Sequence, residues 1–384
     1  MAWQPIHLPG DSKIILPSSY ACIRFYQNKV PYTNFTITMT VYELDPLADA
    51  RWSALLSDHP QSSIFHTGAW LEALRRTYGY KPLVFTTSSG DRLTNGLVVC
   101  EVRSCITGQR LVSLPFSDHC QPLANGSELR AILEYLQDYR HKRRLHHIEL
   151  RPLHFIDGMD QCTAFTRSAK FSFQAIDLRP GIDAIYRNFH DSCVRRKIRR
   201  AERESLRYQA GRSVELLEKF RRLLLLTRRR HKLPPQPISW FLNLIQCLGD
   251  SITFHLVSKD DTPVASIVTL TYRDSVIYKY GCSDPRLNNL GGTSLLFWKV
   301  IQQAKTEGAE EFDLGRSDYE DPGLIAFKEH LGAASSELCY YRNPATLLKP
   351  QSLTGQPPLY RRVLSHLPDA LFAGAGELFY RHIG

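Results

Sequence analysis

Hydrophobic residues recur with helical spacing in some parts of the chain and in short extended runs in others. Between residues 45 and 78 the apolar side chains, among them Trp52, Leu55, Trp70 and Leu71, recur every three or four positions, which predicts helices. Short runs of strand-forming residues follow, separated by turn residues. The expected strands of this first part are 82–86, 96–102, 110–114, 147–150 and 173–178, with a helix over 127–144.

The second part of the chain repeats this style after a basic segment, 182–205, which is expected to form one linking helix. The expected helices are 214–232, 238–247, 292–305 and 324–330, and the expected strands are 252–257, 264–271, 276–281, 311–315 and 338–342. Leucines at helical spacing over 360–383 predict a tail that packs on the body, with a membrane surface as the alternative. Residues 1–38 show neither period, so we expect a disordered lead there, with a start site placed too far upstream as the alternative.

Length and composition are those of a folded globular protein. The 384 residues fit two domains of about 150 residues with extensions, and 43% hydrophobic with 22% charged residues argues against disorder. No apolar run approaches the roughly 18 residues of a membrane span, and the first 38 residues show no secretory signal. Nine scattered cysteines without a Cys-x-x-Cys pair argue against a disulfide framework and a zinc ribbon, so a cytoplasmic location is expected.

Positive charge is concentrated in two segments of a chain whose net charge is +10. Residues 195–207 hold seven basic side chains and two acids, and residues 221–232 hold six basic side chains and no acid. Such clusters attract the phosphates of a coenzyme, an anionic lipid surface or RNA, or they form a solvated helical face. The sequence leaves these readings open.

The loop around residues 282–294 has features of a phosphate site. A strand expected to end at 281 leads to Arg286, two glycines and a helix. Unscreened backbone amides and the helix N-terminus carry partial positive charge, to which the Thr293 and Ser294 hydroxyls and the Arg286 guanidinium would add donors. This arrangement would suit a pyrophosphate, although a glycine pair before a helix is also an ordinary turn. The loop matches neither the nucleoside-triphosphate loop nor the dinucleotide fingerprint.

The same residues resemble a known family. Arg286-x-x-x-Leu290-Gly291-Gly292-Thr293 is similar to the coenzyme-binding motif of the GNAT acyltransferase superfamily, Arg/Gln-x-x-Gly-x-Gly/Ala, with Asn289 in place of the first glycine and Gly291 in that of the second. The runs 312–333, 227–237 and 114–123 resemble the FemAB-like or CelD-like branch (BioF2-like acetyltransferase domain) of that superfamily. The resemblance covers about residues 50–345.

The resemblance implies an α/β (α+β) fold with two tandem GNAT-like domains, each a mixed, largely antiparallel sheet flanked by helices. The implied divisions are 39–180 for the first domain, 181–212 for a basic linking helix, 213–345 for the second domain with the donor motif, and 346–384 for a linker and helical tail. The implied cofactor-binding residues are Arg286, Asn289, Leu290, Gly291, Gly292, Thr293 and Ser294.

The implied activity is N-acyl transfer, with an acetyl or other acyl group passing from acyl-coenzyme A to an amine of a cell-envelope, polysaccharide or amino-acid type acceptor. Strands 276–281 and 311–315 would splay apart around the thioester arm, and direct attack in a ternary complex needs no enzyme nucleophile. One alternative is a FemAB-type transferase that uses aminoacyl-tRNA. Another is a non-catalytic protein that binds nucleic acid or a membrane surface. For the location, the alternative to a purely cytoplasmic protein is one peripheral to the inner membrane face.

Polar residues after the strand 311–315 are candidates for the acceptor side. Arg316, Asp318, Tyr319 and Lys328 are the expected catalytic residues, with Asp318 as base and Tyr319 as acid; a salt-bridged loop is the alternative. Expected substrate-binding residues are Arg230, His231 and Asp118. Neighbouring residues on an extended chain point apart, so 117–119 does not form a catalytic triad. No histidine spacing indicates a metal, and no metal site is predicted.

Overall fold

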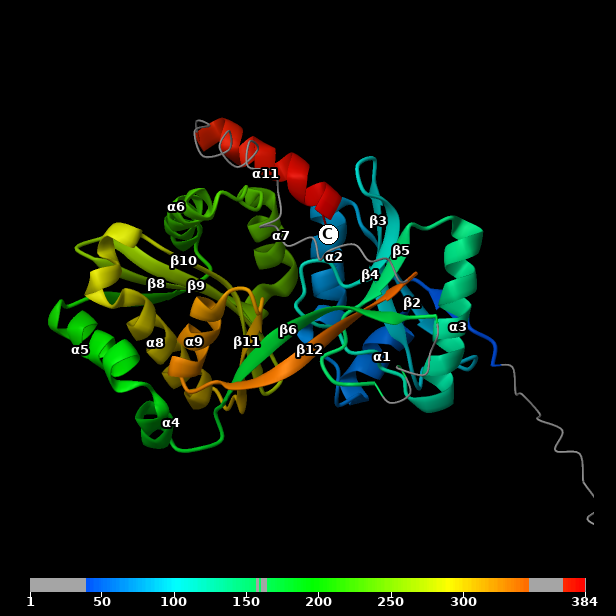
Figure 1. Cartoon of the computed structure of the whole chain (residues 1–384), viewed down its shortest axis with the longest axis horizontal. Coiled ribbons are helices and arrows are strands. Elements are labelled where there is room, and N and C mark those ends of the chain that lie inside the picture. Colours follow the sequence, from blue (N-terminus) through cyan, green and yellow to red (C-terminus); the bar gives the residue numbers. More distant parts are fainter. Residues whose placement is uncertain (1–38, 157–158, 160–163, 345–368, 384) are drawn as a thin grey trace, which may run out of the picture. The chain divides into compact units, whose positions relative to one another are not determined.

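The computed structural model describes residues 39–156, 159, 164–344 and 369–383, and the expectations for residues 1–38 and for the linker before the tail lie outside them. Its strands form a twelve-stranded sheet in the order β1-β2-β3-β4-β5-β12-β6-β11-β10-β9-β8-β7 (Figure 1). The strands are β1 (Tyr42–Leu44), β2 (Lys81–Thr86), β3 (Leu97–Ser104), β4 (Gly108–Ser113), β5 (His147–Leu150), β6 (Thr166–Asp177), β7 (Arg207–Gly211), β8 (Ile252–Lys259), β9 (Thr262–Tyr272), β10 (Ser275–Ser283), β11 (Glu311–Ser317) and β12 (Ala334–Asn343).

Helices flank this sheet, so the mixed α/β class expected from the sequence is confirmed. The helices are α1 (Ala50–Asp58), α2 (Gly68–Tyr78), α3 (Gly126–Arg143), α4 (Ile182–Asn188), α5 (Arg196–Arg203), α6 (Val214–His231), α7 (Ile238–Leu248), α8 (Gly292–Thr306), α9 (Pro322–His330) and α11 (Asp369–Ile383). Short 3-10 turns are η1 (Ile64–His66), η4 (Gly249–Ser251) and η5 (Pro285–Leu290), and η3 (Asp191–Arg195) is one π-helical turn.

Two long strands join the halves of the chain by crossing between them. Strand β6, from the first half, pairs antiparallel with β11 and with β12, both from the second half. Strand β12 in turn pairs antiparallel with β5 of the first half. The two expected sheets are therefore one continuous sheet, and each half contributes its last strand to the boundary.

The basic segment expected to be one helix, 182–205, is broken into α4, the π-helical turn and α5. The break occurs because Phe189 is extended and the His190 N–H donates to the His330 carbonyl at 2.9 Å instead of to the preceding helical turn. Ser205 then adopts a left-handed conformation, and the chain enters β7, which pairs with β8 at the sheet edge. The sequence pattern gave no indication of β7.

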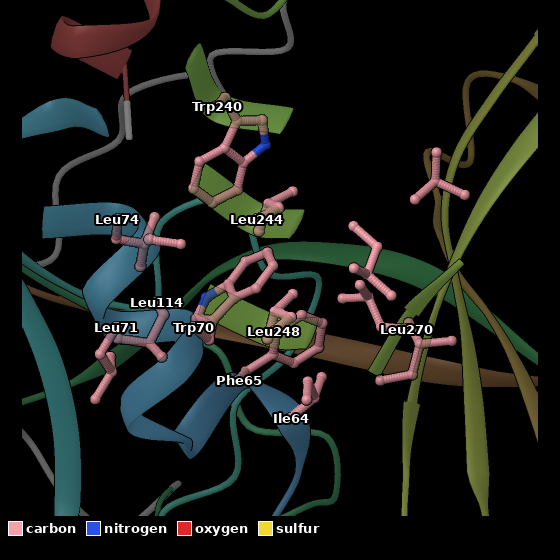
Figure 2. Packing of buried hydrophobic residues seen from close by; sticks show 14 of the residues in the cluster. Ile64, Phe65, Trp70, Leu71, Leu74, Leu114, Trp240, Leu244, Leu248 and Leu270 are labelled. Atoms are coloured by element: carbon pink, nitrogen blue, oxygen red, sulfur yellow. The ribbon is translucent and has the colours of Figure 1, made fainter. Parts of the chain in front are cut away.

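The largest group of buried hydrophobic residues extends across both halves (Figure 2). Trp70 of α2 meets Trp240 of α7 edge to face, with ring centroids 5.3 Å apart, and both side chains are fully buried. The Trp240 indole N–H donates to the Tyr280 hydroxyl at 2.7 Å, which connects this contact to β10. Because the core is shared, the two halves are expected to unfold together.

The C-terminal helix α11 packs against parts of both halves. The Tyr380 hydroxyl donates to the Pro234 carbonyl at 3.2 Å in the α6–α7 loop, and the Tyr80 hydroxyl donates to the Tyr380 carbonyl at 3.0 Å. Gly376 lies against the Pro235 carbonyl, where a Cβ atom would clash. Among the helices that the structure describes, none has the length and apolar character that crossing a bilayer requires.

Replacing Trp240 by alanine is expected to lower the free energy of unfolding of both halves in a single transition, by about 3–5 kcal/mol. Urea unfolding followed by tryptophan fluorescence and by far-ultraviolet circular dichroism would measure it. Leu242→Ala on the same helix, whose side chain is 40% exposed, is the control and should cost much less. Two separated transitions would contradict a shared core.

The docking of α11 can be tested with two glycines of the same helix. Gly376→Ala should destabilise the protein by about 1–3 kcal/mol because the added methyl group meets the Pro235 carbonyl. Gly374→Ala has open space around its Cβ position, so it should be neutral or stabilising by up to about 1 kcal/mol through helix propensity. Thermal unfolding and limited proteolysis would compare them; equal effects of the two changes would refute this docking.

Candidate active site

Strands β10 and β11 lie parallel for a short distance and then separate. Their registered pairs are Ser275 with Glu311, Val276 with Phe312 and Ile277 with Asp313. After Ile277, β10 has no strand partner on this side in the described part of the chain, and its register with β9 shifts between Tyr278 and Tyr280. The expected splay is confirmed. We call the opening between β10 from Tyr278 onward and β11 from Leu314 onward the strand gap.

The edge of β11 that faces the strand gap is satisfied by side chains. Asp313 Oδ1 accepts a hydrogen bond from the Gly315 N–H at 2.6 Å, and Gly315 has a left-handed φ of 71°. The Lys328 ammonium, from α9, donates to the carbonyls of Gly315 at 3.0 Å and Arg316 at 3.1 Å. Since these polar groups already have partners, β11 has little tendency to pair with β10 here.

The last residue of β10 is hydrogen-bonded to a side chain of α6. Thr227 Oγ1 accepts from the Ser283 N–H at 3.1 Å and donates to the Ser283 carbonyl at 3.3 Å. The hydroxyl thus takes the place of a neighbouring strand at this residue. Between Ile277 and Ser283 the backbone of β10 faces the strand gap, so an extended ligand could add its own hydrogen bonds to this edge.

A loop from the first half brings two polar residues to the strand gap. His119 Nε2 lies 2.7 Å from Asp313 Oδ2, and both side chains are buried. The His119 ring packs edge-on against Phe65 and Phe173, with centroids 5.6 and 5.5 Å apart. This pair ties the loop to β11 at the point where the strands part.

Asp118, the neighbouring residue, approaches Gly315 so closely that a Cβ there would clash with its carboxylate. Arg316 Nε lies 3.8 Å from Asp118 Oδ1, and the guanidinium stacks over the Phe171 ring at 4.0 Å. Burial raises the pKa of Asp118, but the cations Lys279 and Arg316 lower it more, so the net pKa lies below the usual range. Asp118 is therefore an ionised carboxylate at neutral pH.

Two lysines approach the same region. Lys328 is buried, and burial lowers its pKa to about 8 although Asp118 and Asp313 act in the opposite direction. Lys279 lies at the register shift of β10, with its ammonium 5.7 Å from the Phe65 ring centroid, and burial lowers its pKa too. Sequence reasoning missed Lys279 because the apolar pattern of the strand does not reveal the irregularity that places it here.

A basic pocket of about 210 Å³ lies beside the start of α8. Its lining residues are Lys197, Arg230, Ser283, Asn288, Gly291, Thr293, Ser294 and Phe327. Two of these side chains are cationic and none is acidic. Helix α8 begins at Gly292 after the glycine cap Gly291, so no side chain covers the N–H groups of its first turn. Cations, hydroxyls and free amides together favour a phosphate-bearing ligand.

The expected cofactor-binding residues divide into two groups. Gly291, Thr293 and Ser294 line the basic pocket, whereas Asn289, Leu290 and Gly292 are not among its lining residues. Arg286 is 79% exposed and forms an ion pair with Asp284 at 2.6 Å, so its charge lies outside the pocket.

Lys197 and Asn288 line the pocket but were missed from the sequence. Asn288 lies one position before the expected Asn289, and Lys197 belongs to a helix that precedes the motif by about 90 residues. A Cβ at Gly291 would clash with the Lys197 carbonyl, so this glycine is needed for the packing of α5 on the turn as well as for an open helix end.

The expected acceptor-side residues also lie in different places. Arg316, Lys328 and Asp118 meet at the strand gap. Asp318 and Tyr319 are exposed in the turn after β11. The remaining two lie at the end of α6, where Arg230 lines the basic pocket and His231 is exposed with Nε2 3.4 Å from Arg230 Nη2.

The part of the chain that forms this site is similar to a known domain family. Residues 190–329 match the profile of the acetyltransferase (GNAT) domain, a region that contains β10, β11 and the basic pocket. No curated protein matches the chain in sequence.

Solved structures with the same fold include FemX, with a TM-score of 0.62 and 15% identity over 82% of this chain and 98% of FemX. The C-terminal domain of a putative lysylphosphatidylglycerol synthetase from Agrobacterium fabrum has a TM-score of 0.51, with 12% identity over 79% of this chain and 92% of that domain. A tandem GNAT protein from the clavulanic acid biosynthesis pathway has a TM-score of 0.50, with 12% identity over 81% of this chain and 99% of that protein.

At these identities the likeness is one of fold, while the profile match identifies the domain that holds the strand gap. The region 190–329 is therefore similar to a GNAT acetyltransferase domain, and the chain shares its fold with FemX and with a tandem GNAT protein.

Proposed function

We propose that the protein is an N-acyltransferase that carries an acyl group from acyl-coenzyme A to an amine, in an acceptor of the cell-envelope, polysaccharide or amino-acid type. The observation that carries this proposal is the strand gap, which has one satisfied edge and one open edge and lies next to a basic pocket. The satisfied edge is β11, held by Asp313 and Lys328. The open edge is β10, whose last residue, Ser283, lines the pocket.

On the donor side, the basic pocket suits the pyrophosphate of coenzyme A. Lys197 and Arg230 supply charge, and Thr293 and Ser294 lie at the first turn of α8. The thioester arm, which carries amide groups, would run from the pocket along the open edge of β10. Its amides would form the hydrogen bonds that β11 does not supply. The acyl carbonyl would reach the apex of the strand gap, which is the point where β10 and β11 separate after Ile277 and Asp313.

At the apex, the acceptor nitrogen attacks the thioester carbonyl carbon. The C–N bond forms, the C–S bond breaks, and coenzyme A leaves as a thiolate, which takes up the proton that the amine gives to Asp118. We assign Asp118, which is ionised, to take the amine proton, and the Lys328 cation to stabilise the oxyanion. Asp318 and Tyr319, expected from the sequence as base and acid, lie exposed in the turn after β11, and we assign them to contacts with the incoming acceptor.

Aminoacyl-tRNA is the second candidate donor, and one observation favours it. Helix α5 carries exposed basic side chains, among them Arg196 and Arg203, beyond those that the basic pocket uses. The contact between Gly291 and the Lys197 backbone brings this helix directly against the turn that precedes α8. A nucleic acid whose acceptor end entered the pocket would cross this surface, whereas coenzyme A would not need it.

The donor can be tested by charge reversal inside and outside the basic pocket. The pair Lys197→Glu and Arg230→Glu should weaken coenzyme A binding at least about tenfold, because two charge-assisted contacts are lost. The pair Arg196→Glu and Arg203→Glu leaves the pocket unchanged and should not alter coenzyme A affinity. Calorimetric titration of both double variants with coenzyme A and with tRNA measures this.

If coenzyme A does not bind the unmodified protein, the first proposal fails. Binding of tRNA that both double variants weaken, with a steep dependence on salt, would support the second donor. Substitution of Gly291 is a poor test, because a side chain there displaces α5 whether or not a ligand binds the turn.

Lys328 is expected to contribute to the transition state. Lys328→Met should lower kcat by about 100-fold or more, as loss of an oxyanion-stabilising group does, and should change the KM for the donor little. Lys142→Met, an exposed lysine on α3, is the control. Thermal unfolding must accompany the kinetics, because the variant also leaves two carbonyls without their donor.

The pH dependence tests the charge on Lys328 separately. With its pKa lowered to about 8, the side chain is cationic below pH 8 and neutral above, so kcat should fall as the pH rises through about 8. Lys328→Arg keeps its charge beyond pH 12 and should lose this decline. A wild-type kcat that keeps rising from pH 7 to 10 would show that the ammonium charge is not needed.

A further inference from the structure

We propose a zinc site formed by His190, Cys193 and His330. The ligand atoms of these three side chains, two imidazole nitrogens and one thiol sulfur, all lie within 4.8 Å of one another. His190 and Cys193 are three positions apart at the π-helical turn, and His330 is the last residue of α9, 140 positions further along the chain. This inference is independent of the donor and acceptor proposed above.

The backbone holds the three ligands in place. The His190 N–H donates to the His330 carbonyl at 2.9 Å, so the two histidines are fixed side by side with ring centroids 4.5 Å apart. His190 Nδ1 accepts from the Cys193 N–H at 3.3 Å, which leaves Nε2 as the nitrogen that can bind a metal. A π-helical turn is uncommon, and such turns often occur at functional sites.

The donor set selects the kind of metal. Two imidazoles and a thiolate suit zinc or cobalt, whereas magnesium and calcium prefer oxygen ligands. Zn–N and Zn–S bonds of about 2.0–2.3 Å in a tetrahedron bring ligand atoms to roughly 3.5 Å from one another, which small side-chain rotations would achieve. Cys193 and His330 are half-buried and His190 is exposed, so a metal can enter and solvent can take the fourth position.

The position of the site gives it a structural role. Helix α9 carries Phe327, which lines the basic pocket, and Lys328, which bonds the edge of β11. A metal at its last residue would fasten α9 to the turn that leads into α5. Because α5 packs on Gly291, the metal would stabilise two elements that border the site.

Cobalt titration of the tag-free, metal-stripped protein tests the proposal. One equivalent of Co²⁺ should produce a thiolate charge-transfer band in the near ultraviolet, and Zn²⁺ should abolish it. Cys193→Ser should remove the band, and His330→Gln should weaken metal affinity at least about tenfold. Cys105→Ser and His141→Gln change an exposed cysteine and an exposed histidine elsewhere, and should have no effect.

A measurement on the unmodified protein tests the zinc site even if the variants fail to fold. Stoichiometric Zn²⁺ should slow alkylation of Cys193 by iodoacetamide, followed by peptide mass spectrometry, while Cys105 stays equally reactive. Zn²⁺ should also raise the melting temperature of the wild type and not that of Cys193→Ser. Absence of stoichiometric binding, or alkylation of Cys193 at the same rate with and without Zn²⁺, would overturn the proposal.

Discussion

The site depends on the hydrogen bonds that satisfy β11 where it leaves β10. Two strands that begin as a parallel pair would normally stay paired along their length, because unpaired backbone groups are costly to bury. Here the Asp313 carboxylate accepts from the Gly315 N–H, and the Lys328 ammonium donates to the Gly315 and Arg316 carbonyls, so these three backbone groups of β11 do not need β10. The opening is thus a stable part of the fold, and within the described residues β10 has no strand partner there after Ile277.

These groups also determine the electrostatics of the strand gap. His119, from the first half, lies within hydrogen-bond distance of the Asp313 carboxylate, and Asp118 from the same loop lies against Gly315. Lysine and arginine side chains surround the two carboxylates, so each charge has a partner of opposite sign nearby. The half that does not line the basic pocket therefore supplies side chains to the strand gap.

Much of the fold was predictable because its elements are local. The strand 147–150 was predicted with the bounds that β5 has, and α6 and α8 agree with their predicted bounds to within one residue. The separation of β10 and β11 followed from the resemblance to the GNAT superfamily. What the sequence did not reveal depends on contacts between distant residues. The break at His190, caused by a carbonyl 140 positions away, has no signal in the local pattern, and neither has the approach of the Lys197 backbone to Gly291.

The crossing of β6 and β12 has a consequence for how such a chain can change in evolution. Cutting or recombining the chain near residue 181 would leave β6 without β11 and β12, and β5 without β12. Each fragment would then expose a long strand edge, which favours aggregation over independent folding. The two halves are accordingly not interchangeable modules, and we expect them to fold only as one unit.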